Sequence, residues 1–153
     1  MTVLTAILIV LITFIVMEGV AWFSHKYIMH GFLWSLHHDH HVKSPGFFEK
    51  NDAFFLIFAL PSASGFILGT LTSYTFLFFI ALGILLYGIA YFFIHEVFIH
   101  QRFKWMSRSD NTYLRAIRKA HKVHHKHLTK EQGECFGMLI VPLKYWKEQQ
   151  KSK

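Results

Sequence analysis

The sequence predicts an all-α integral membrane protein, with about three transmembrane helices and a helical cap in a single domain over residues 1–153. Two observations lead to this fold class: long uncharged runs, and basic residues that are strictly separated from those runs. Apolar types make up 53% of the chain and charged types 16%, which excludes a disordered chain and an ordinary soluble domain. The lone cysteine, Cys135, forms no internal disulfide, so we expect the polar part to face a reducing compartment.

The first transmembrane helix is predicted over residues 3–24. No charged residue occurs from Met1 to Met17, and the apolar run continues past Glu18. At 1.5 Å per residue, about 20 residues cross the hydrocarbon core of a bilayer. A cleavable signal peptide would need a basic start and a small-residue cleavage site, and neither is present. We therefore expect a helix that stays in the membrane.

The second and third helices are predicted over residues 53–71 and 75–94. The segment between Ala53 and Ile94 is uncharged and long enough for two crossings joined by a turn near 71–75. Pro61 falls inside the second helix, which is tolerated where neighbouring helices satisfy the freed carbonyl. Gly65 and Gly69 form a GxxxG pair that predicts a close helix-packing face.

The basic residues predict the orientation of the chain. Of the 16 Lys and Arg residues, three lie between Lys26 and Lys50 and 13 lie from Arg102 onward. With three crossings all of them fall on one side, and the positive-inside rule makes that side cytoplasmic. We expect the N-terminus outside and a cytoplasmic cap formed by residues 25–52 and 95–153.

This topology is the first explanation of the net charge of +7, because the cytoplasmic loops of membrane proteins are rich in Lys and Arg. Contact with anionic lipid head groups and docking of an acidic protein partner are the alternatives. No nucleic-acid partner is expected, since no nucleic-acid-binding motif accompanies the charge.

A fourth apolar stretch, residues 136–143, is too short to span a membrane. It predicts a re-entrant or interfacial segment or a piece of the cap's core.

The twelve histidines fall into four clusters with a repeated spacing. The pattern HxxxxH followed by HxxHH occurs twice, and each HxxxxH begins where a predicted membrane helix ends. The ten histidines that obey this spacing are His25, His30, His37, His40, His41, His95, His100, His121, His124 and His125. Neutral imidazole is a common protein ligand for zinc, copper, iron and nickel. The repeated spacing therefore predicts metal binding.

The two spacings predict different geometries on a helix. Positions i, i+3 and i+4 share a face, so the three histidines of each HxxHH can point to one side together. Positions i and i+5 lie about 140° apart at 3.6 residues per turn. Each HxxxxH pair therefore reaches one metal only if the helix is locally distorted, and otherwise its members serve two centres.

Ten imidazoles are too many for one ion, so we expect two ions. Structural zinc is the alternative to a redox metal, although such sites usually use cysteine. Three carboxylates, Glu18, Asp39 and Glu96, are candidates to orient the imidazoles. His38 and His127 fall outside the repeated spacing, and we expect them to support the ligands or to lie at the surface.

The histidine clusters and their flanks resemble a known family. HKYIMHG at 25–31, HxxHH at 37–41, HEVFIHQR at 95–102 and AHKVHH at 120–125 are similar to the bacterial β-carotene hydroxylases, within the fatty acid hydroxylase/sterol desaturase superfamily. The likeness extends to Glu18, to residues 49–52 and to the stretch from Lys130 to Gly137.

This resemblance implies a non-haem di-iron monooxygenase. Such enzymes use O2 and electrons from ferredoxin and its reductase to hydroxylate C3 and C3′ of β-carotene, giving β-cryptoxanthin and then zeaxanthin. The resemblance assigns the ten regularly spaced histidines as iron ligands. Another lipid, such as a fatty acyl chain or a sterol, is the alternative substrate. A histidine-rich metal-binding or transport membrane protein is the remote alternative.

Overall fold

The structure is a computed structural model that describes residues 1–42, 46–106 and 108–151. The described residues are helical or irregular and contain no β-strand, so the predicted all-α class is confirmed. The parts of the predicted cap at 43–45, 107 and 152–153 lie outside the described residues.

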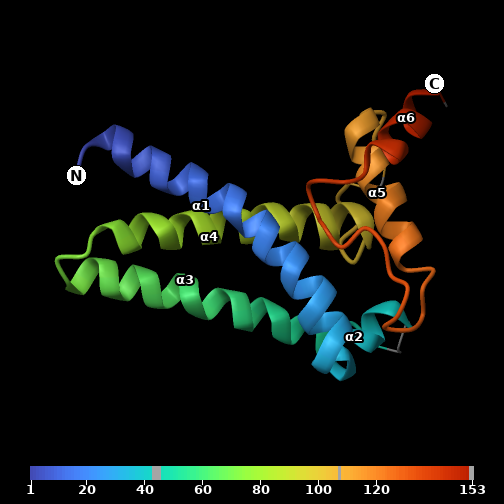
Figure 1. Ribbon diagram of the computed structural model, residues 1–153, viewed down its shortest axis with the longest axis horizontal. Coiled ribbons are helices and arrows are strands. Elements are labelled where there is room, and N and C mark those ends of the chain that lie inside the picture. Colours follow the sequence, from blue (N-terminus) through green and yellow to red (C-terminus); the bar gives the residue numbers. More distant parts are fainter. Residues whose placement is uncertain (43–45, 107, 152–153) are drawn as a thin grey trace.

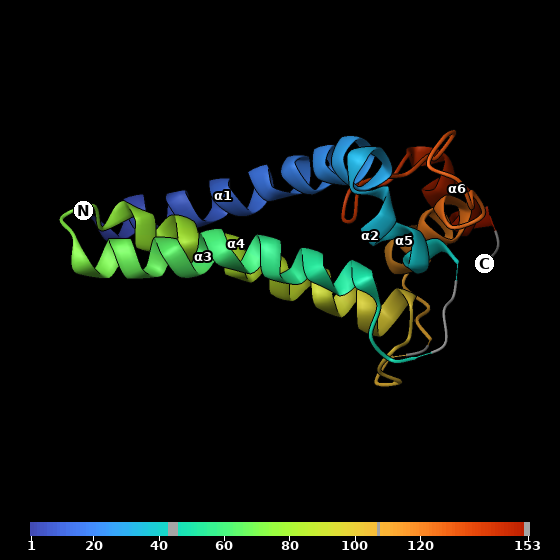
Figure 2. The same cartoon turned by 90° about the horizontal axis from the view of Figure 1, so that it is seen from below.

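Three long helices lie side by side along the length of the molecule (Figures 1 and 2). They are α1 (Val3–Phe23), α3 (Ala53–Leu71) and α4 (Phe76–Phe92), and α4 packs against both of the others. All three belong to segments that are long and apolar enough to cross a membrane. Side chains such as Leu11 and Leu60 are exposed on these helices, as expected where lipid replaces water. The three long apolar helices that the sequence predicts are thus present as candidate membrane spans.

Glycine allows the close approach of these helices. A Cβ added at Gly69 would lie 2.4 Å from the backbone nitrogen of Phe78, and one at Gly65 would lie 2.9 Å from the Cβ of Ala81. A Cβ at Gly83 would lie 2.6 Å from the Cβ of Thr13 on α1. Small residues at such crossings let backbones pack tightly in the absence of a hydrophobic driving force. The packing role predicted for the GxxxG pair is confirmed.

Two of the long helices continue as π-helices beyond their predicted ends. The π-helix Ser24–Phe32 follows α1, and the π-helix Phe93–Ile99 follows α4. The continuous apolar segments therefore run over Val3–Phe32 and Phe76–Ile99. Three of the histidines that we placed after the helices, His25, His30 and His95, instead lie within these π-helices, and His100 directly follows the second one.

A cap of shorter helices gathers at one end of the bundle, away from the N-terminus and the α3–α4 turn (Figure 1). It comprises α2 (Trp34–His41), a 3₁₀ turn (Lys50–Asp52), α5 (Thr112–His124) and α6 (Leu143–Lys151). Asn111 caps α5, because its side-chain oxygen accepts the backbone N–H groups of Tyr113 and Leu114 at 2.9 and 3.1 Å.

The short apolar stretch at 136–143 is irregular up to the start of α6 and forms part of the cap's core. Met138 is buried against Phe98, Ile99 and Ile117. The backbone of this stretch also reaches back to Glu18 on α1. Packing in the cap's core, one of the alternatives left open by the sequence, is thus found for Met138.

The helix crossings generate a stability prediction. Gly69→Ala should lower the melting temperature of the purified protein in detergent, because overpacking of this kind costs about 1–3 kcal/mol. Gly19→Ala on α1 is the matched control, since a Cβ there meets nothing within 4 Å. Thermal unfolding followed by circular dichroism tests this prediction, and equal melting temperatures for the two variants would contradict it.

Candidate metal centre

Nine of the ten predicted ligands meet in two buried groups, each with its nitrogen atoms within 4.8 Å of one another. We call these the five-histidine group and the four-histidine group. The five-histidine group consists of His25, His30, His37, His41 and His124, and the four-histidine group consists of His40, His95, His100 and His121. The tenth, His125, lies beside the four-histidine group, with its Nε2 atom 2.8 Å from the Nε2 atom of His121.

The π-helices bring each HxxxxH pair to one group. A π-helix bonds residue i+5 to residue i, and the His100 N–H donates to the His95 carbonyl at 2.9 Å. Both members of this pair belong to the four-histidine group, and His25 and His30 both belong to the five-histidine group. The sequence left open whether each pair serves one centre or two. Because the helix is locally distorted into a π-helix, both members of each HxxxxH pair serve one centre.

Each HxxHH box is shared between the two groups. His37 and His41 belong to the five-histidine group, whereas His40 belongs to the four-histidine group. The box on α5 divides in the same way, with His124 in the first group and His121 in the second. The helices α2 and α5 therefore hold the two groups next to each other.

Hydrogen bonds at the outer nitrogen, Nδ1, hold the five-histidine group. His37 Nδ1 bonds the side-chain oxygen of Asn51 at 2.7 Å. The other four rings bond backbone carbonyl oxygens at 2.8–3.2 Å, in the pairs His25–Phe136, His30–Lys130, His41–His127 and His124–Glu134. A chain segment distant in sequence therefore orients most of this group.

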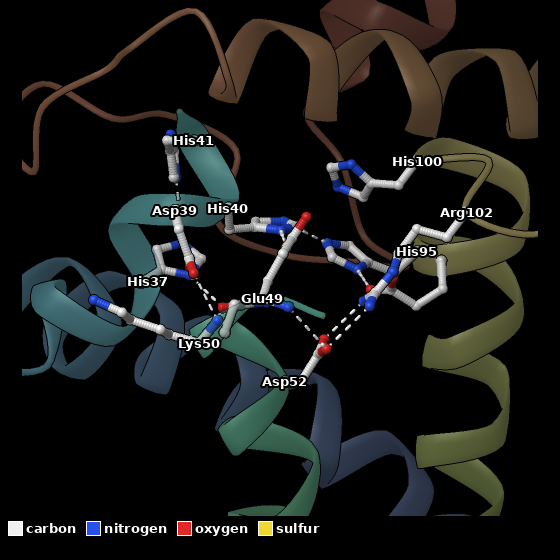
Figure 3. Close-up of polar contacts among 12 residues, drawn as sticks. His37, Asp39, His40, His41, Glu49, Lys50, Asp52, His95, His100 and Arg102 are labelled. Carbon is white, nitrogen blue, oxygen red and sulfur yellow. Dashed lines mark hydrogen bonds and ion pairs between the residues drawn. The ribbon is translucent and has the colours of Figure 1, made fainter. Parts of the chain in front are cut away.

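Carboxylates hold two rings of the four-histidine group, His40 and His95 (Figure 3). His40 Nδ1 lies 2.9 Å from Glu49 Oε2, and His95 Nδ1 lies 2.5 Å from Glu96 Oε1. Arg102 donates through Nη1 to Glu96 at 2.9 Å and to Asp52 at 2.7 Å. These contacts link the π-helix Phe93–Ile99 to the start of α3. Carboxylate partners of this kind fix the tautomer of an imidazole and raise its basicity as a ligand.

The inner nitrogens are arranged for a cation. A neutral imidazole carries one proton, and an Nδ1 that faces a carbonyl oxygen must donate it, so Nε2 is left with a lone pair. In His25 and His37 these Nε2 atoms lie 3.1 Å apart, and in His30 and His124 they lie 3.2 Å apart. No proton is available to join either pair, and both are buried. Adjacent nitrogens would lie about 3.0 Å apart around a metal with bonds of about 2.1 Å at right angles. The donor set therefore fits divalent metal ions.

Burial keeps these rings in the form that binds metal. Removal from water, together with neighbouring imidazoles, lowers the pKa of His41 to about 4 and the pKa of His100 and His124 to about 3. The pKa values of His40 and His121 are lowered well below their usual range by the same causes. At neutral pH these rings are uncharged, as a metal ligand must be.

The three candidate carboxylates and the two irregularly spaced histidines make different contacts in the structure. Glu96 contacts an imidazole as expected. Asp39 instead accepts the backbone N–H of Lys50 at 2.6 Å, and Glu18 bonds the 138–140 backbone rather than an imidazole. His38 is exposed, and the half-buried His127 contributes its backbone carbonyl to His41.

Sequence reasoning missed several residues that orient the imidazoles. Glu49 and Asn51 each bond a ring, and Arg102 connects Glu96 to Asp52. A polar cluster directly before an apolar span was the available signal for Glu49 and Asn51. The backbone carbonyls that accept from the rings could not be recognised from any pattern of side chains in the sequence.

An apolar cavity of about 520 Å³ opens onto the five-histidine group from the membrane side. It lies among α1, α3 and α4 and is lined by side chains such as Phe54, Phe58 and Phe66. His25 and Phe136 form part of its wall near the histidines. A hydrophobic molecule that enters along the helices would thus reach the candidate metal centre.

The family model for fatty acid hydroxylases matches residues 10–145 and covers all four histidine clusters. The chain belongs to the fatty acid hydroxylase family. A β-carotene hydroxylase of Pseudescherichia vulneris is 38% identical over 136 residues, which is 88% of this chain and 76% of that protein. One of Pantoea ananas is 39% identical over 135 residues, 88% of this chain and 77% of that protein.

A chloroplastic β-carotene 3-hydroxylase of Arabidopsis thaliana is 35% identical over 135 residues, 82% of this chain and 41% of that protein. No solved structure matches the chain. As a member of the fatty acid hydroxylase family, the protein is homologous to β-carotene hydroxylases from bacteria and plants.

Substitution of single histidines should distinguish metal ligands from histidines that do not bind the metal in this member of the fatty acid hydroxylase family. His41→Ala and His124→Ala should each lower the metal content of the purified protein, because each removes a donor from the five-histidine group. His127→Ala should change the metal content much less, because His127 acts on His41 through its backbone carbonyl. Elemental analysis measures the metal, and equal losses in all three variants would contradict the assignment.

The lowered pKa values predict that the metal-free protein loses stability in acid. An unfolded histidine titrates near pH 6.5, whereas His41 titrates near 4 in the folded chain. Between these values the unfolded state binds more protons, so the free energy of unfolding falls as pH falls below about 6.5. Melting temperatures of metal-free protein from pH 8 to pH 5 measure this. The exposed His38→Ala variant should show the same slope, and a pH-independent melting temperature would contradict the prediction.

Proposed function

We propose that the protein is a di-iron monooxygenase that hydroxylates the β-ionone rings of β-carotene at C3 and C3′, giving β-cryptoxanthin and then zeaxanthin. The observation that carries the proposal is the meeting of two adjacent groups of buried imidazoles with an apolar cavity. The printed names of the relatives from Pseudescherichia vulneris and Pantoea ananas support the carotenoid as substrate.

The reaction sets the requirement for a redox metal. Hydroxylation converts C–H and O2 into C–OH and water, and it consumes two electrons and two protons from outside. Zinc has no redox chemistry, whereas iron bound to the two histidine groups would supply the activation of O2 and the oxidation of the C–H bond. The residues themselves hold the metals, orient the substrate and keep water away.

The cavity suits the end of a long apolar molecule. Its wall on α3 includes Phe54 and Phe66, which are about 18 Å apart at 1.5 Å per residue. A polyene that lies along this wall would present one terminal ring to His25 and leave its remainder between the helices and the lipid. One ring is then exposed to the metals at a time, which agrees with two successive hydroxylations.

The electron donor and the orientation belong to the same proposal. Ferredoxin and its reductase would deliver electrons at the cap, where the basic residues of α5 and α6 favour an acidic partner. The confinement of the basic residues to this end supports a cytoplasmic cap and an outside N-terminus. The bacterial relatives support a bacterial inner-membrane location. O2 is the second substrate and membrane lipid is the surrounding medium.

Hydroxylation or desaturation of another lipid by the same chemistry is the second candidate. The match to the fatty acid hydroxylase family model supports it, because that match covers all four histidine clusters. A metal transporter is disfavoured, since transport sites lie near the bilayer midplane, whereas these histidines lie at the helix ends and in the cap.

Expression in cells that accumulate β-carotene tests the proposed activity. Pigment extracts should contain β-cryptoxanthin and zeaxanthin, because a carotenoid ring can reach the histidines through the cavity. The His124→Ala variant is the control for metal dependence and should leave β-carotene unchanged. Unchanged pigment with the unaltered protein, present in the membrane and loaded with iron, would contradict the carotenoid and favour another lipid.

A further inference from the structure

The segment 127–140 is the support of the five-histidine group. Backbone carbonyls of His127, Lys130, Glu134 and Phe136 accept the Nδ1–H groups of four of its five rings at 2.8–3.2 Å. Residues 126–142 form no helix, so internal backbone bonds of a helix do not hold this segment in place. Its position therefore depends on contacts with other parts of the chain.

Glu18 supplies such a contact from inside the membrane-spanning helix α1. Its Oε1 atom accepts the backbone N–H groups of Met138, Leu139 and Ile140, each at 2.9 Å. Its Oε2 atom accepts the hydroxyl of Tyr87 on α4 at 2.7 Å. The Glu18 residue is only 7% exposed. Three charge-assisted bonds to consecutive amides tie the segment to the bundle.

The segment is shaped to fit this carboxylate. A Cβ added at Gly137 would lie 3.1 Å from Glu18 Oε1 and 2.7 Å from the carbonyl oxygen of Ile140. Only a residue without a side chain leaves the room for this approach. The next residue toward the N-terminus, Phe136, holds His25 by its carbonyl at 3.0 Å. The Glu18 contact and the first imidazole are thus two residues apart along the segment.

The four-histidine group does not use this support. Its ring His40 bonds Glu49, which precedes the 3₁₀ turn before α3, and its ring His95 bonds Glu96 on the π-helix after α4. Arg102 joins these elements through Glu96 and Asp52. The hydrogen bonds that orient the rings thus differ between the groups: backbone carbonyls hold four rings of the five-histidine group, and carboxylates hold two rings of the four-histidine group.

We propose that Glu18 is a positioning residue for one of the two metal ions: by fixing residues 138–140 it sets the carbonyls that orient the five-histidine group, and it leaves the four-histidine group unaffected. The inference rests on the proposed function only in that both groups bind iron. An ionisable residue inside a membrane helix is costly and is usually retained for such a role.

Removal of the carboxylate should release the segment. Glu18→Leu leaves three N–H groups without their acceptor, and the one of Met138 is buried. A buried unsatisfied donor costs about 1–3 kcal/mol. The segment can satisfy these groups only by moving toward water, which withdraws the Phe136 carbonyl from His25. Glu18→Gln keeps one acceptor oxygen at this position and should therefore retain most of the support.

Iron content of the purified full-length protein in detergent is the direct test. We expect about two irons per unaltered chain, about one per chain for Glu18→Leu, and a value close to two for Glu18→Gln. Gly137→Val should also fall to about one iron, although it leaves α1 unchanged. This second variant keeps the test decisive if Glu18→Leu fails to fold.

Double variants identify which ion is lost. Addition of His124→Ala to Glu18→Leu should cause no further loss of iron, because both changes act on the five-histidine group. Addition of His121→Ala should remove the remaining iron. If Glu18 only stabilised the fold, Glu18→Leu would lower the iron content of both histidine groups together.

Equal loss of both ions, or no loss in either Glu18→Leu or Gly137→Val, would overturn the inference. Failure of the unaltered protein to bind iron would instead contradict the proposed function. The two failures are therefore distinguishable in one set of measurements.

Discussion

The whole site depends on one constraint: each buried imidazole must point its lone pair inward, and it does so only if its other nitrogen has an acceptor. For seven of the ten regularly spaced histidines the structure provides a carbonyl, amide or carboxylate oxygen at Nδ1. The inner nitrogens of these rings then lie 3.1–3.2 Å from another Nε2 atom with no proton between them. This arrangement is costly without a cation and stable with one.

The membrane determines where this constraint can be met. Hydrocarbon supplies no hydrogen bonds, so the acceptors come from polar chain that packs over the helix ends, as the 127–140 segment does. The long helices deliver His25 and His95 to the same end of the bundle, and their π-helical turns align each with its partner at i+5. The cavity among α1, α3 and α4 then connects lipid to these rings. A site that acts on a membrane-dissolved molecule gains access in this way without exposing its metals to bulk water.

The fold and the histidine pattern could be predicted from the sequence because both follow from local rules. Uncharged runs of sufficient length and one-sided basic residues predict the three spans. The repeated histidine spacing predicts metal binding, and the number of imidazoles predicts two ions. The allocation of ligands could not be predicted, because the i+5 pairs converge only through a π-helical distortion. The groups that orient the imidazoles could not be predicted from the sequence either. Phe136 holds His25 by its backbone carbonyl, and Glu18 was expected beside an imidazole but bonds residues 138–140. Contacts across more than a hundred residues of sequence leave no local periodicity.

The central claim is that the two histidine groups bind a pair of irons through imidazole nitrogen. X-ray absorption at the iron edge of the purified protein tests it most directly. The account predicts a nitrogen shell near 2.1 Å with the multiple-scattering pattern of imidazole, and about two irons per chain in the same sample. An oxygen- or sulfur-dominated shell without imidazole scattering, or an iron content well below two per chain, would contradict it.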